Sequence, residues 1–61
     1  MFRWTVTTRN TMHRGQERTI EGARRVARKL AETSPGGGIV TIDDLDGKRS
    51  TFETFAVQEK N

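Results

Sequence analysis

Residues 19–31 read TIEGARRVARKLA, and this stretch decides the fold because its spacing predicts an amphipathic helix. The hydroxyl of Thr19 can accept a hydrogen bond from an unpaired N–H of the first turn, so we expect the helix to begin there. Pro35 should end it, and one of the glycines at 36–38 should take the left-handed conformation that follows many helices. The apolar side chains form one stripe that would pack closely on a sheet: Ile20, Ala23, Val26, Ala27, Leu30 and Ala31.

Extended segments are predicted on both sides of this helix. Residues 2–8, FRWTVTT, alternate apolar and polar side chains, which is typical of a half-buried strand. Residues 9–15 show no periodicity and should form a polar, basic loop. Residues 16–18 form either a short returning strand or the approach to the helix. Residues 39–44 and 49–58 predict two more strands, which we expect to form a hairpin.

A turn at residues 46–47, Asp-Gly, should connect these last two strands. Two registers compete. A two-residue turn would pair Val40 with Glu53, whereas a longer turn with a glycine bulge would pair Val40 with Phe52. The second register is favoured because it buries more apolar surface.

The last strand carries apolar side chains on both of its faces. Phe55 and Val57 have the opposite parity to Phe52, and Ile39 is expected on the same face as Phe55 and Val57. A bulge near Glu53 would return all of them to one core. Otherwise a second subunit covers this face, or it is exposed as a site for a partner. Ile39, Phe55 and Val57 are therefore the candidate protein-interface residues.

Together these elements predict an α+β fold in which one helix packs on a three- to four-stranded, mostly antiparallel sheet. The chain order is strand, short strand, helix, strand, strand, and the last strand is expected to lie beside the first. The 61 residues form a single small domain, residues 1–61. A chain of this size buries only about 60% of its unfolded surface, and without cysteine it has no disulfide to compensate. We therefore expect self-association, most simply as a homodimer.

The sequence contains no apolar run near the ~20 residues that cross a bilayer, and no signal-peptide segment follows Met1. We therefore expect a cytoplasmic protein with no membrane partner, in the bacterial host if the chain is phage-derived.

No motif in the chain predicts a reaction or a metal site. Residues 44–47 and Glu53 match parts of a calcium loop, but Ile42 occupies the position of its first ligand. Residues 35–38 are glycine-rich but lack the Gly-Lys-Ser/Thr ending of a phosphate loop. His13 has no predictable nucleophile to activate. We expect no enzyme activity, catalytic residue, cofactor, metal ion or small-molecule substrate.

The charge is distributed unevenly along the chain. Residues 1–29 hold eight Lys/Arg and two Glu, a net charge of +6, while residues 30–61 hold three Lys/Arg and six Asp/Glu, a net charge of −3. The basic half is either a solvated surface with salt bridges, such as Glu21 with Arg25, or a surface that binds phosphates or an acidic protein. The candidate nucleic-acid contacts are Arg9, Arg14, Arg18, Arg25, Arg28 and Lys29.

Four short motifs, spread over nearly the whole chain, suggest a family: Trp4-x-Val6, Thr19-x-Glu21-x-Ala23, Leu30-Ala31 and Asp46-Gly47. In these motifs the chain resembles small, largely uncharacterised ββαββ domains of bacteria and their phages. The resemblance implies a shape and no catalytic residue. The first half is also similar to the arm-binding modules of phage integrases, which have three strands before the helix where this chain has at most two.

Two functions follow as expectations. The favoured one is a small non-catalytic interaction module, such as a phage- or mobile-element-type accessory protein that binds or inhibits a larger protein assembly. It would act through a sheet face or edge, with self-association. The alternative is a nucleic-acid-binding module that contacts phosphates through its arginine-rich loop and helix face.

Overall fold

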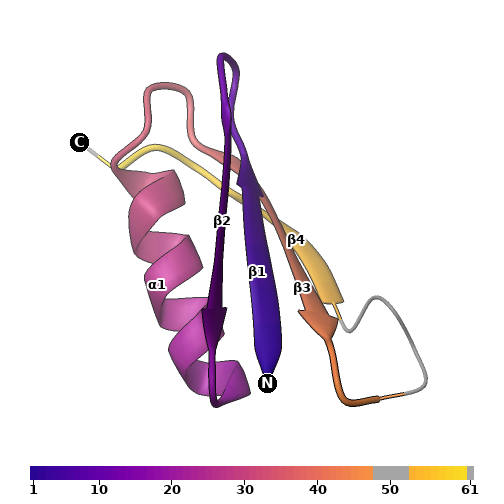
Figure 1. Cartoon of the computed structure of the whole chain (residues 1–61). Helices are drawn as coiled ribbons and strands as arrows, with labels where there is room; N and C mark the ends of the chain where they lie inside the picture. Colours follow the sequence, from indigo (N-terminus) through magenta and orange to yellow (C-terminus); the bar gives the residue numbers. More distant parts are fainter. Residues whose placement is uncertain (48–52, 61) are drawn as a thin grey trace.

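The sheet and the helix form two layers in the computed structural model, which describes residues 1–47 and 53–60. The fold is α+β: one helix packs against a four-stranded antiparallel sheet in the order β2-β1-β3-β4 (Figure 1). The elements are, in chain order, β1 (Phe2–Thr7), β2 (Met12–Glu17), α1 (Ile20–Glu32), β3 (Gly38–Asp44) and β4 (Glu53–Val57).

The core lies between α1 and the two central strands. Val6 of β1 stands opposite Val40 of β3, and Trp4 stands opposite Ile42. Three of these side chains are fully buried, and Trp4 is 8% exposed. Because side chains alternate along a strand, these residues all lie on the sheet face that α1 covers. The other face is called the open face below.

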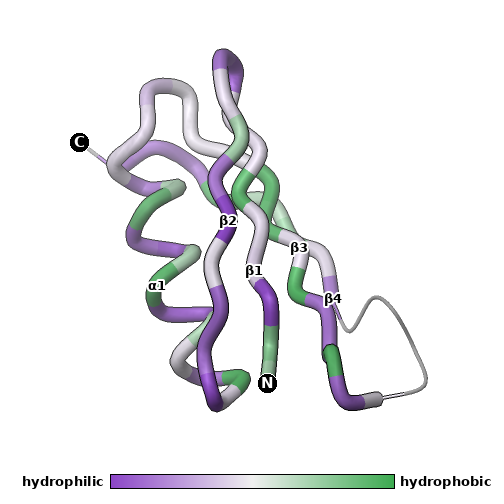
Figure 2. Tube along the Cα trace, viewed as in Figure 1, coloured by the Kyte–Doolittle hydropathy of each residue, from purple (hydrophilic) through white to green (hydrophobic). Residues whose placement is uncertain are grey.

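The helix begins at the predicted cap. The hydroxyl of Thr19 accepts a hydrogen bond from the N–H of Gly22 at 3.0 Å. Ala23, Ala27 and Ala31 are fully buried, so the alanine stripe lies against the sheet as expected. Figure 2 shows hydrophobic and hydrophilic segments alternating along α1, as an amphipathic helix requires.

The strand β2 corrects the prediction of a loop at residues 9–15. The loop is short, because the N–H of Thr8 already donates to the carbonyl of Thr11 at 2.8 Å, and the returning strand begins at Met12. The short strand expected as one alternative at residues 16–18 is therefore longer and begins earlier, and its start was misplaced because β2 has no apolar alternation. Its middle residue on the covered face is Gly15, and the space above this glycine is filled by the indole of Trp4.

The position and register of β4 correct two further predictions. β4 pairs with β3 as expected for a hairpin, but it lies at the sheet edge and not beside β1 as expected, because β3 itself pairs with β1. Val40 pairs with Phe55, so both predicted registers are wrong. The observed register places Phe55 and Val57 on the covered face, where they add apolar area to the core. Residues 49–52 of the predicted strand, with Phe52, lie outside the described residues.

The glycines after the helix form a tightly packed connection. Gly36 and Gly37 both have positive φ, at 81° and 72°. A Cβ on Gly37 would lie 2.2 Å from the carbonyl oxygen of Val57, and one on Gly38 would lie 2.9 Å from that of Thr7. Only glycine lets the chain pass this close to the ends of β1 and β4.

Candidate interaction surfaces

The three candidate interface residues do not share a face. Ile39 is 45% exposed on the open face, as predicted for a second apolar surface. Val57 is 7% exposed in the core, and Phe55 packs against the core from the same side. The guanidinium of Arg28 lies 5.1 Å from the centre of the Phe55 ring and covers it further. The expected common face of Ile39, Phe55 and Val57 is therefore wrong, because it followed from an incorrect register.

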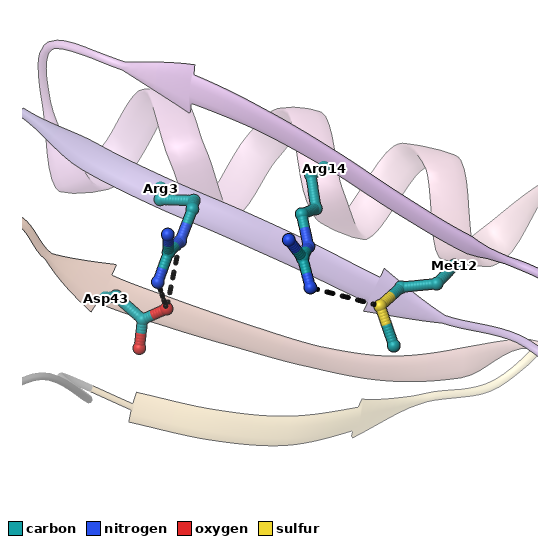
Figure 3. A network of polar contacts seen from close by, with 4 residues as sticks. All are labelled: Arg3, Met12, Arg14 and Asp43. Carbon is teal, nitrogen blue, oxygen red and sulfur yellow. Dashed lines mark hydrogen bonds and ion pairs between the residues drawn. The ribbon is translucent and has the colours of Figure 1, made fainter.

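The open face is mainly polar. Arg3 donates two hydrogen bonds to one carboxylate oxygen of Asp43, from Nε at 3.3 Å and Nη2 at 3.1 Å, and Arg14 lies near the sulfur of Met12 at 3.7 Å (Figure 3). Met12 and Ile39 are half exposed at one end of this face. Two separate apolar side chains on a threonine-rich face do not form a large hydrophobic patch.

The candidate nucleic-acid residues are dispersed over the molecule. Arg9 lies in the connection between β1 and β2, and Arg18 lies in the connection between β2 and α1, so the two are at opposite ends of β2. Arg14 is on the open face. Only Arg25 and Lys29 come together, on one flank of the helix. The structure thus divides the basic residues among separate surfaces.

This flank of the helix borders a shallow, open apolar groove of about 610 Å³ that α1 forms with Trp4 of β1. We call it the Trp4 groove. It is lined by Trp4, Arg25, Val26, Lys29, Leu30 and Thr33. The sequence assigned Val26 and Leu30 to the core, but both remain partly exposed. The available signal was their position at the margin of the stripe, on the same flank as Arg25 and Lys29.

Trp4 lies beneath the groove with an unusual polar environment. Its indole Nε1 is buried and has no hydrogen-bond partner among the described residues. A buried N–H without an acceptor costs about 1–3 kcal/mol. The ring also lies directly over Gly15, where a Cβ would be 2.4 Å from ring atom Cζ2. The indole is therefore held in place by its fit to the glycine.

The two flanks of the helix differ in charge pairing. On the β4 side, Arg24 forms an ion pair with Glu53 at 2.6 Å, and this hydrogen bond raises the pKa of Arg24 above its usual value. On the groove side, neither Arg25 nor Lys29 forms an ion pair with any described residue. The expected pair of Glu21 with Arg25 is not formed. The Trp4 groove thus keeps two uncompensated positive charges on its rim.

The strand β2 is an uncovered sheet edge that pairs only with β1. In an antiparallel pair, residues alternate between bonding the neighbouring strand and directing their backbone groups outward. Thr8 and Thr11 are a hydrogen-bonded pair, so the alternation assigns the outward N–H and C=O groups to every second residue of β2. These residues are Met12, Arg14 and Gln16.

A second hollow, of about 560 Å³, lies where the ends of β1 and β4 meet the glycine connection. It brings together Arg9, Ile39 and Val57, three of the candidate residues. The N–H of Gly36 donates to a carboxylate oxygen of Glu59 at 2.9 Å in this region. An acidic side chain thus already lies beside Arg9 in the hollow.

No protein-family model, curated protein or solved structure matches the chain. Within the part of the chain that the structure describes, α1 is too short and too polar to cross a membrane.

Proposed function

We propose that the chain is a small, non-catalytic protein-interaction module that binds by adding a strand to its β2 edge, and that its partner is a second copy of itself. The observation that carries this proposal is the six-residue edge strand with outward backbone groups at Met12, Arg14 and Gln16. Exposed edges of this kind bind extended strands through main-chain hydrogen bonds.

The charges on β2 favour one register for pairing with a second copy. Antiparallel pairing with Arg14 opposite Arg14 of the partner subunit would place like charges side by side, which is destabilising. Pairing with Gly15 opposite Gly15 of the partner subunit avoids this contact. It places His13 opposite Glu17 of the partner subunit and Arg14 opposite Gln16 of the partner subunit. The outward backbone N–H and C=O groups of the two strands then face each other.

The other sheet edge is a weaker candidate. β4 has five described residues against six in β2, and the chain after it turns back to the helix, where the backbone N–H of Lys60 donates to the carbonyl of Glu32 at 2.9 Å. The β1–β2 hairpin has no comparable covering segment among the described residues. A larger protein that offers a strand, as in a phage- or mobile-element-type assembly, would compete with the second copy for β2.

Sedimentation equilibrium from micromolar to millimolar concentration tests the proposal. We expect the wild-type chain to form dimers and Gln16→Pro to remain monomeric, because proline removes an outward N–H that β1 does not use. Gln16→Ala is the matched control, since it keeps the N–H and should dimerise like wild type. Circular dichroism checks that both variants fold. A wild-type monomer at millimolar concentration would contradict the proposal.

A mobility-shift assay with generic DNA and RNA separates this proposal from the nucleic-acid alternative. The dispersed cations lead us to expect no shift at moderate salt. A salt-sensitive shift that is lost in Arg14→Ala plus Arg18→Ala would instead support phosphate binding through the basic residues.

A further inference from the structure

We propose that the Trp4 groove binds an acidic amphipathic helix of a partner protein. The groove has an apolar floor, a basic rim and no acidic residue among those that line it. It lies on the covered side of the sheet, beside the helix, and is distinct from the outward backbone groups of β2. The inference therefore does not depend on self-association.

The spacing of the lining residues matches a helix. Val26 and Leu30 are one turn apart along α1, and Arg25 and Lys29 are one turn apart beside them, so each pair is separated by about 6 Å along the axis. A docked helix with apolar residues at i and i+4 and acidic residues one position further repeats with the same rise. In an extended peptide, adjacent side chains point in opposite directions, so neighbouring residues would not reach both the floor and the rim.

The positive charge of the groove rim favours an acidic partner. Arg25 and Lys29 lack ion-pair partners among the described residues, so an incoming carboxylate would not displace an existing contact. A second copy of α1 does not fit, because its corresponding flank carries the same two cations and like charges would face each other. The complementary occupant is a helix with glutamate or aspartate along the border of its apolar face.

Trp4, which lies beneath the groove, provides a probe of binding. Trp4 is the only tryptophan of the chain, which has no tyrosine. Its emission therefore reports directly on the groove.

A synthetic helical peptide with leucine at every fourth position and glutamate beside each leucine serves as the probe. We expect it to change the emission of Trp4 in a saturable way, and to bind about tenfold more weakly to Arg25→Gln plus Lys29→Gln. The matched control is Arg9→Gln plus Arg18→Gln, which removes the same charge away from the groove and should bind like wild type. Binding should also persist in Gln16→Pro, whatever the oligomeric state of that variant.

Four results would overturn the inference. The first is the absence of saturable binding by the glutamate peptide. The second is equal weakening by the two double variants, which would indicate general attraction to a basic protein. The third is equal binding of a peptide with lysine in place of glutamate, which would assign the groove to apolar segments in general. The fourth is binding of decanoate alone, which would assign the groove to a small amphiphile.

Discussion

At the scale of single residues, Trp4 and Gly15 define each other's positions. The indole crosses from β1 to cover the glycine on β2, and its exposed fraction is 8%. The glycine is required by this close contact and not by its backbone, because its φ is not positive. Gly15, which has no side chain of its own, thus determines the position of Trp4 beneath the groove.

The substitution Gly15→Ala should lower the free energy of unfolding by about 1–3 kcal/mol, because the new methyl group would overlap the ring of Trp4. Urea denaturation followed by Trp4 emission measures the change. Gln16→Ala, one residue further on the same strand, places its change on the open face and should have little effect. Equal stability of Gly15→Ala and wild type would show that the indole can move away without cost.

At the scale of elements, the parts predicted from the sequence are those with a visible period. The first strand alternates around Trp4 and Val6, and the helix carries a capping threonine and an alanine stripe, so both lie where they were expected. The full extent of β2 could not be found this way, because an aromatic ring from its neighbour replaces the side chain that Gly15 lacks. Local sequence does not contain that information.

The candidate site was less predictable than the fold. The faces of Phe55 and Val57 depend on the register of β4, and a shift of one residue exchanges the two faces of a strand. The favoured register, with Val40 opposite Phe52, is three residues from the observed pairing of Val40 with Phe55, and an odd shift puts Phe55 and Val57 on the wrong face. The other register considered, with Val40 opposite Glu53, is two residues away and would have given the observed faces. To predict the Trp4 groove, one must know which flank of α1 lies toward β1 and β2. This depends on the strand order β2-β1-β3-β4.

Alanine substitutions at Gly36 and Gly37, the two glycines with positive φ after α1, should lower the stability by different amounts. Gly36→Ala should lower the free energy of unfolding by about 1–2 kcal/mol, because alanine is strained at a positive φ. No larger loss is expected, since only the flexible end of the Arg9 side chain lies near the new Cβ. Gly37→Ala should cost clearly more, because its methyl group would also overlap the backbone of Val57. Thermal denaturation of the two variants side by side gives the order. Equal losses would mean that β4 can shift to make room.

At the scale of the whole molecule, folding and self-association should be linked. If two copies pair through β2, mass action stabilises the folded state as the concentration rises. We expect the Tm of the wild-type chain to increase by roughly 5 °C over a hundredfold rise in concentration. The Tm of Gln16→Pro should stay constant over the same range. Differential scanning calorimetry provides the measurement, and a constant Tm for wild type would argue against coupling.

The alanine stripe of α1 also has a thermodynamic consequence. Its buried side chains at Ala23, Ala27 and Ala31 are single methyl groups, so unfolding transfers little hydrocarbon to water at the interface between the two layers. For an average chain of this length, the heat capacity rises by about 0.8 kcal/mol/K on unfolding. The rise for this chain should be smaller. Its stability curve should accordingly be shallow, with a broad calorimetric peak and weak cold sensitivity.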